Sequence, residues 1–374
     1  MKVWVKECGG DFNLKMVSRW VRKGISVESL TERAEVAVND IVLYSAGDKT
    51  VIKGQLPDNA VLFENVFQPL TVSATRELTY NFDLYYLRQA LARAEQARTE
   101  TIITGSSYCL FGIDGKQLSR EVNLGMTSQD LYYALRGVYE VCAHNSNIKN
   151  VVLVSGTYYL YSDLSKTQNE SEILRVAKVY EPLFGDLHNC KLLAPRERHL
   201  SHSNFLDAER ILEVFSEMEY ERGYFNEERP RTNFQTGTWE RNAGWHDLSE
   251  QERWEAGKER AKMHNGNKKY VATFLENRQL LQEFLHFCGE RGINAVVVIP
   301  PATKYYRAAL DQAYKEELVA FLESAQGIVH LLDLYDSDAF EEQDFNDTDH
   351  LSDAGAGKLT QMIRNLVESI STSS

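Results

Sequence analysis

Thr101-Ile-Ile-Thr-Gly-Ser-Ser107 joins a short β-branched run to a glycine and two serines. β-branched residues favour strands, and a glycine lets the backbone turn sharply where a strand ends. The stretch therefore predicts a buried strand with the hydroxyl of Ser107 standing at the start of the next segment. Taken alone, a Gly-Ser-Ser triplet is more often a turn, a helix cap or a phosphate-binding loop.

Amphipathic and apolar segments alternate on both sides of this stretch. Asp83 can cap a helix that carries Leu84, Leu87 and Leu91 on one face. Further continuous apolar runs are Val151–Val154, Asn294–Ile299 and Ile328–Leu332. Short buried strands separated by amphipathic helices predict an α/β fold. We expect three α/β/α layers around a mainly parallel, flavodoxin-like sheet.

Two regions depart from this alternation. Residues 1–78 predict a small N-terminal domain that contains β structure, with a hairpin of strands at 34–44 and 50–53. Residues 79–374 form the main predicted domain. Inside it, the charged and aromatic stretch at about 195–267 is too long for an ordinary loop and predicts an insertion.

Bulk composition narrows the possible functions of the 374-residue chain. A formal net charge of −13 repels nucleic acid over long range, and no apolar run reaches the length of a membrane span. Five isolated cysteines and no secretory leader favour a reducing cytoplasm without disulfides. We therefore expect a cytoplasmic protein with no nucleic-acid partner and no membrane insertion. The oligomeric state is left open.

The sequence offers no cofactor or metal signature. Glycine-rich dinucleotide, phosphate-loop and His-Glu-x-x-His patterns do not occur. His199 and His202 have helical ligand spacing but no accompanying carboxylate or cysteine pattern. We expect neither a cofactor nor a metal.

A second polar segment, Phe345-Asn-Asp-Thr-Asp-His350, precedes the last predicted helix. A histidine can remove the proton of a serine if a carboxylate orients its ring. Asp347, three residues before His350, has suitable spacing in a tight loop. Asp349 is the rival, but adjacent side chains usually point apart. We expect Ser107, His350 and Asp347 to form a catalytic triad.

Gly125 lies in Val122-Asn-Leu-Gly-Met-Thr-Ser128, just before a predicted helix. Its amide could stabilise an oxyanion beside the amide of Ser107. A plain strand-to-helix turn is the alternative.

In combination, these segments resemble the SGNH/GDSL hydrolase superfamily. Gly105-Ser-Ser107, Asn123-Leu-Gly125 and Asp347-x-x-His350 stand in the family's order, and Leu351 to Gly355 continue its usual ending. The resemblance covers about residues 80–372. It implies a serine nucleophile at Ser107, an oxyanion amide at Gly125, and a base and orienting acid at His350 and Asp347.

The chain departs from the family pattern at three places. Ser106 replaces an aspartate, Tyr108 replaces a leucine, and Ser155-Gly-Thr-Tyr-Tyr159 lacks the third-block asparagine that donates to the oxyanion. Thr157 or Tyr158 could contact the substrate there instead. The Gly-Ser-Ser variant is similar to bacterial proteins of surface-glycan acyl modification and D-alanyl-lipoteichoic-acid transfer.

Lys304 and Arg307 follow the apolar strand at 294–299 and could bind a phosphate or carboxylate of the substrate. A helix start with solvated cations is an equal alternative. The resemblance implies a serine esterase or O-acyltransferase that forms an acyl-Ser107 intermediate on an acylated sugar or glycan precursor. Its partners would be a small-molecule or glycan substrate and an acyl donor. The alternative is a non-catalytic SGNH-like scaffold or ligand-binding protein in surface-polysaccharide biosynthesis.

Overall fold

The computed structural model describes residues 1–6, 14–18, 21–45, 59–62, 67–72, 75–80, 82–167, 170–191, 213–214, 245–325 and 329–373. By their internal contacts, these residues divide into two compact units. Unit 1 comprises Met1–Arg88 and Ser165–Phe225, and unit 2 comprises Gln89–Leu164 and Asn226–Ser374. The predicted boundary between residues 78 and 79 stays a prediction.

Unit 1 contains a four-stranded parallel sheet of order β2-β1-β3-β4. Its strands are β1 (Lys2–Val5), β2 (Ser26–Ser29), β3 (Ile41–Tyr44) and β4 (Ala60–Leu62). Both edges of β3 pair with parallel neighbours, so no edge is left for the predicted antiparallel hairpin partner. The hairpin prediction is wrong for β3, and its return strand at 50–53 lies outside the described residues.

The remaining elements of unit 1 are short. A two-stranded antiparallel ribbon pairs β5 (Phe67–Val72) with β6 (Thr75–Tyr80). The helices are α1 (Leu14–Val17), α6 (Glu170–Arg175), a π turn at Val176–Tyr180 and α7 (Glu181–Phe184). Helix α3 (Phe82–Ala94) contains the division between the two units.

Unit 2 is built on a five-stranded sheet of order β8-β7-β9-β10-β11, in which neighbouring strands pair in parallel. The strands are β7 (Thr101–Gly105), β8 (Glu121–Asn123), β9 (Asn150–Val154), β10 (Asn294–Ile299) and β11 (Val329–Asp333). Counted along the chain this is the order 2-1-3-4-5 of flavodoxin-like folds, whose switch point lies between β7 and β9. The predicted parallel α/β sheet is confirmed.

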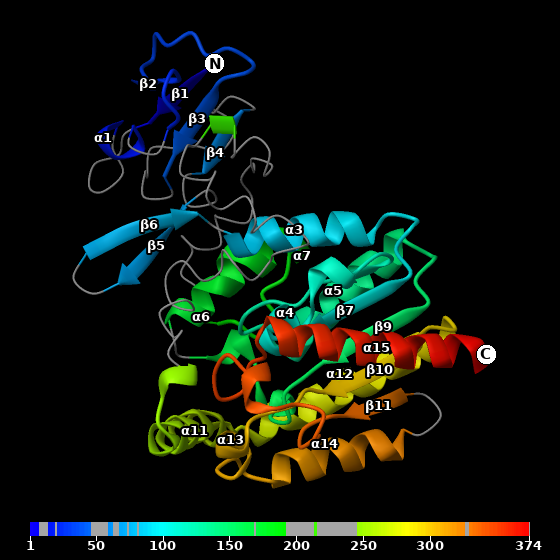
Figure 1. Ribbon diagram of the computed structural model, residues 1–374. Helices are drawn as coiled ribbons and strands as arrows, with labels where there is room; N and C mark the ends of the chain where they lie inside the picture. The colour runs from blue at the N-terminus through cyan, green and yellow to red at the C-terminus, as the bar shows by residue number, and fades with distance from the viewer. Residues whose placement is uncertain are drawn as a thin grey trace. The chain divides into compact units, whose positions relative to one another are not determined.

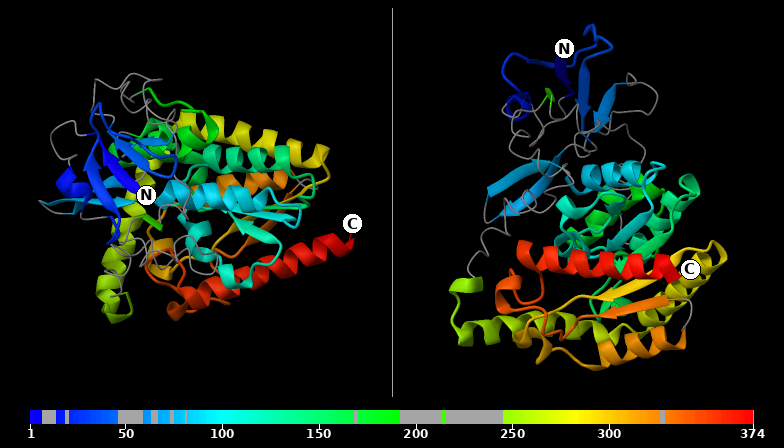
Figure 2. Two further views of the ribbon diagram at one scale, coloured as in Figure 1. Left: turned by 90° about the horizontal axis from the view of Figure 1, so that it is seen from above. Right: turned by 45° about the vertical axis from the view of Figure 1, so that its right-hand side comes forward.

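Helices cover both faces of this sheet and complete a three-layer α/β/α fold (Figure 1, Figure 2). Helix α15 (Asp353–Ser373) packs on one face, where its Leu359 and Ile363 share a buried cluster with Ile103 of β7. Thr104, the next residue of β7, points the other way and donates from its hydroxyl to Ala134 O in α5 (Leu131–His144). This alternation along β7 sets which side chains reach each layer.

The other helices of unit 2 frame the sheet and its carboxyl edge. They are α4 (Ser107–Gly112), α11 (Glu250–Asn265), α12 (Val271–Glu290), α13 (Lys304–Arg307) and α14 (Ala313–Ser324). Short 3₁₀ turns lie at Gly115–Gln117, Tyr159–Tyr161, Leu164–Lys166, Trp245–Asp247, Gly266–Lys269 and Glu342–Asp344. None of the described helices is both long enough and apolar enough to cross a bilayer.

The predicted insertion at 195–267 ends in regular structure. Ser249 and Glu252 form a reciprocal capping box at the start of α11, with each side chain accepting from the other's backbone amide. The Ser-x-x-Glu spacing that makes this cap is readable in the sequence. Of the earlier part of the predicted insertion, only residues 213–214 are described.

Candidate active site

Ser107 is the first residue of α4, directly beyond the end of β7. Gly105 turns the chain there with φ of +144°, a conformation that L side chains rarely adopt. A Cβ on Gly105 would lie 2.0 Å from Val154 O of the paired strand β9. Only glycine therefore allows this turn, and the turn brings Ser107 to the carboxyl edge of the sheet at the switch point.

His350 lies in a tight loop between the 3₁₀ turn at Glu342–Asp344 and helix α15. An isolated antiparallel bridge between Phe345 and Leu351 closes the loop. Inside it, Oδ1 of Asp347 accepts from the amides of Asp349 at 2.9 Å and His350 at 2.7 Å. These backbone bonds fix the Asp347 carboxylate beside the ring that it serves.

The three predicted triad residues lie together. Oγ of Ser107 is 2.8 Å from Nε2 of His350, and Nδ1 of His350 is 2.9 Å from Oδ2 of Asp347. A carboxylate at Nδ1 holds the proton on that nitrogen, which leaves Nε2 to accept the hydroxyl proton of Ser107. His350 is only 5% exposed, so its ring is shielded from bulk water, whereas the Asp347 side chain is 25% exposed.

The charges around His350 favour its protonated form. Burial alone would lower the pKa of His350, but the carboxylates of Asp347 and Asp349, with the Asp347 hydrogen bond, raise it above its usual value. Asp347 makes the direct bond, whereas Asp349 Oδ1 lies 3.6 Å from Nδ1. The geometry thus favours Asp347 over its rival as the orienting group.

Asp349 forms a further set of buried contacts beside His350, which the sequence did not reveal. Its carboxylate, 1% exposed, accepts from the hydroxyl of Tyr108 at 2.6 Å and from Nε of Arg260 at 3.0 and 3.1 Å. Burial opposes ionisation of Asp349, yet the Arg260 guanidinium holds its pKa far below the ordinary range. Tyr108, the unusual residue after Ser107, also stacks on His350 with ring centroids 5.1 Å apart.

Helix α11 contributes His264 one turn after Arg260, on the same face of the helix. Its Nδ1 lies 2.5 Å from the hydroxyl of Tyr306, and its ring stacks on Tyr158 at a centroid distance of 3.8 Å. Burial, and then the nearby Arg260, lower the pKa of His264 to about 3. His264 is therefore neutral at physiological pH. The polar run from His264 to Tyr270 predicts a rim of the same pocket, whereas no local sequence pattern marks Arg260, because its partner Asp349 lies far along the chain.

The predicted oxyanion amides differ in their surroundings. Ser107 opens α4, where the first amides of a helix have no partner within it. The amide of Gly125 instead donates to Oδ1 of Asn123 at 2.8 Å. A Cβ on Gly125 would collide with Cys109 at 2.6 Å, so close packing against α4 also requires this glycine. Its predicted oxyanion role requires Asn123 to release the amide.

Thr157 and Tyr158 follow β9, the central strand beside β7. The hydroxyl of Thr157 is buried and has no hydrogen-bond partner in the described residues. Tyr158 packs edge-on against Tyr108 at a centroid distance of 6.4 Å. A Cβ on Gly156, between them and the strand end, would lie 2.6 Å from the Tyr108 ring. Gly156 and Tyr158 therefore pack against Tyr108, the residue that follows Ser107.

Lys304 and Arg307 make contacts that do not involve the triad. Nζ of Lys304 pairs with Glu250 at 3.1 Å on the surface. Arg307 donates to the carbonyl oxygens of Ala302 at 2.6 Å and Tyr335 at 3.3 Å, which ties α13 to the chain after β11. These contacts agree with the alternative of a helix start, and substrate binding by the two residues stays a prediction.

Asp347, Asp349 and His350 also offer potential metal-ligand atoms within 4.8 Å of one another. A cation there would have to displace the proton on Nδ1 and compete with Arg260 for Asp349. In the structure, Asp347 bonds to Nδ1 of His350, and Asp349 bonds to Tyr108 and Arg260. His199 and His202 lie outside the described residues.

No protein-family model matches the sequence, and no curated protein matches it. Among solved structures, it is similar to one described as a candidate platelet activating factor from Streptococcus pneumonia. The TM-score is 0.35 at 11% identity, and the alignment covers 76% of this chain and 94% of that chain.

Proposed function

We propose that the chain is a serine esterase or O-acyltransferase of the SGNH type, with Ser107 as nucleophile. The single observation that carries this proposal is the continuous relay from Ser107 Oγ through His350 to Asp347, with contacts of 2.8 and 2.9 Å. A relay of this geometry can ionise a serine hydroxyl as it attacks an ester carbonyl.

In the proposed reaction, Ser107 Oγ bonds to the acyl carbon while its proton passes to Nε2 of His350. The tetrahedral intermediate collapses by breaking the ester C–O bond, and His350 returns the proton to the departing alcohol. Water or an acceptor hydroxyl then attacks acyl-Ser107 by the reverse proton transfers. Asp347 stabilises the imidazolium that forms twice in each cycle.

The proposed oxyanion donors are the Ser107 amide and the hydroxyl of Thr157. An unpaired buried hydroxyl costs roughly 1–3 kcal/mol, and the Thr157 hydroxyl, which has no partner among the described residues, is free to donate to a bound substrate. Gly125 could add its amide once Asn123 moves. The resemblance supports an acylated sugar or glycan precursor as the substrate, and Tyr158 offers an aromatic surface near the turn.

The test is covalent labelling with a fluorophosphonate probe, together with p-nitrophenyl acetate turnover. We expect wild type to be labelled, and Ser107→Ala and His350→Ala to lose about 10³-fold or more of the turnover. Ser106→Ala is the matched control, because the Ser106 hydroxyl has no hydrogen-bond partner among the described residues. Equal background rates in all four proteins would favour the non-catalytic scaffold.

A further inference from the structure

Asp349 places a second buried carboxylate 3.6 Å from Nδ1 of His350, in addition to the bonded Asp347. Two carboxylates beside one imidazole stabilise its protonated form, which cannot accept a proton from Ser107. For His350 to be largely neutral, and so able to accept a proton near neutral pH, a positive charge must offset the negative charge of Asp349.

Arg260 places a positive charge next to the Asp349 carboxylate. Its Nε donates to both oxygens of Asp349, at 3.1 and 3.0 Å. Asp349 accepts further bonds from Tyr108 at 2.6 Å and from the Thr348 hydroxyl at 3.0 Å. Because these donors hold the carboxylate ionised and in place, Arg260 and Asp349 form a neutral unit against the His350 ring.

We propose that Arg260 is a positioning residue for the base: it neutralises Asp349, and thereby keeps His350 available to accept the Ser107 proton near neutral pH. The inference rests on the proposed function insofar as His350 is the base. It makes α11, from the predicted insertion, part of the catalytic machinery. Arg260 donates its hydrogen bonds to Asp349, and its positive charge also lowers the pKa of His350.

The other polar groups around His350 leave this assignment intact. They are Asp347 on its own loop, Tyr108 from α4, Tyr158 after β9, His264 from α11 and Tyr306 from α13. Burial raises the pKa of Tyr108 and of Tyr306 well above 10, so both stay neutral, and His264 is neutral as described above. The formal charges that remain are Asp347, Asp349 and Arg260.

The experiment measures the pKa of His350 directly, by NMR titration of ¹³C-histidine-labelled protein assigned with His350→Gln. In Arg260→Gln, Asp349 is uncompensated, and we expect the pKa of His350 to rise by about one unit or more. In Asp349→Asn, Arg260 is uncompensated, and we expect it to fall by a similar amount. The double variant Arg260→Gln/Asp349→Asn has two neutral side chains, so we expect its His350 pKa to lie near the wild-type value. Arg260→Lys keeps the positive charge and should also leave the pKa of His350 near the wild-type value.

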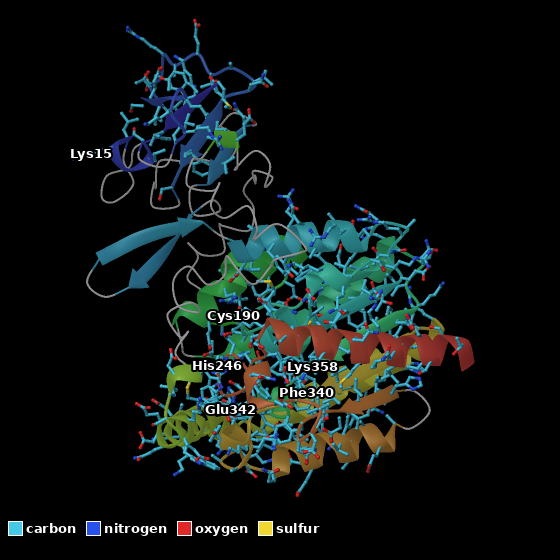
Figure 3. The ribbon with its side chains drawn as sticks, viewed as in Figure 1. Lys15, Cys190, His246, Phe340, Glu342 and Lys358 are labelled. Carbon is cyan, nitrogen blue, oxygen red and sulfur yellow. The ribbon has the colours of Figure 1, made fainter. Side chains whose placement is uncertain are left out.

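The matched control is Arg253→Gln, on the same helix. Arg253 pairs with Glu342 and donates to the carbonyl of His246, both labelled in Figure 3. We expect no shift of the His350 pKa in this variant. Superimposable titrations in all variants would overturn the inference and leave the Arg260–Asp349 pair with a structural role only.

Probe labelling separates this outcome from failure of the proposed function. Shifted titrations without labelling of wild type would refute the serine chemistry and keep the electrostatic inference. Labelling of wild type without any shift of the His350 pKa would support the serine chemistry and refute the electrostatic inference. If Arg260→Gln fails to fold, Asp349→Asn still decides the sign of the pKa shift, since Asn can retain the bond from Tyr108.

Discussion

The hydroxyl of Ser107 lies 2.8 Å from Nε2 of His350, although 243 positions separate the two residues in the sequence. The parallel sheet explains this proximity. Ser107 follows the first strand of the sheet, and His350 follows the last. Because carboxyl ends of parallel strands meet at one edge, the opening and closing loops of unit 2 share that edge.

The first prediction concerns the pH dependence of labelling at Ser107. The pKa of His350 is raised by Asp347 and then Asp349, against the effect of burial, and only neutral His350 can act as base. The rate should therefore increase with pH, with a midpoint above about 6.5. Asp347→Asn should lower this midpoint and reduce the maximal rate by about 10³-fold or more.

Asp338→Asn, an exposed carboxylate change in the chain before the His350 loop, serves as the control and should leave both values unchanged. A midpoint at or below the ordinary histidine value in wild type would contradict the charge arrangement around His350.

Local sequence patterns predicted the parallel sheet and the three triad candidates. They could not predict contacts between segments that lie far apart in the sequence. The run at 101–105 and the turn at Gly105 follow from residue type, and the Asp347–His350 spacing follows from loop geometry. Arg260 could not be found in this way, because an arginine on a charged helix has no local sign of a buried partner 89 positions away. The hairpin prediction failed because parallel pairing of β3 is decided by β1 and β4, not by its own turn residues.

The second prediction concerns the unpaired hydroxyl of Thr157. Thr157→Val keeps the branched shape and removes the proposed oxyanion donor, so kcat should fall by about 10²-fold or more with little change in KM. Thermal stability should stay equal or increase, because the variant removes a buried hydroxyl that has no partner in the part of the chain that the structure describes. Thr157→Ser should keep most of the activity. A fall in stability with unchanged kcat would assign Thr157 to packing.

The third prediction concerns stability in mild acid. Burial and Arg260 lower the pKa of His264 to about 3, whereas an unfolded histidine titrates near 6.5. Between these values the unfolded chain binds a proton that the folded chain does not. The free energy of unfolding should therefore fall as pH decreases from about 6.5, by about 1.4 kcal/mol per pH unit for this group.

Urea denaturation of wild type and His264→Gln at several pH values measures this contribution as a difference in slope. The control is His286→Gln, since the His286 side chain is 75% exposed. His264→Gln should have the shallower pH dependence, whereas His286→Gln should match wild type. Parallel curves for all three proteins would show that His264 binds its proton over the same pH range in the folded and unfolded chains, against the arrangement described here.

The last prediction concerns the turn that presents Ser107. Gly105→Ala would force an L side chain to φ of +144° and place its Cβ 2.0 Å from Val154 O, so either the turn or the β7–β9 pairing must move. Strain and overpacking together should cost on the order of 3–5 kcal/mol, a large part of the stability of an ordinary domain. Gly289→Ala on α12 is the control: nothing lies within 4 Å of its added Cβ, so stability should stay equal or rise by about 0.5–1 kcal/mol. Similar denaturation midpoints for both variants would mean that β7 does not end in the turn described here.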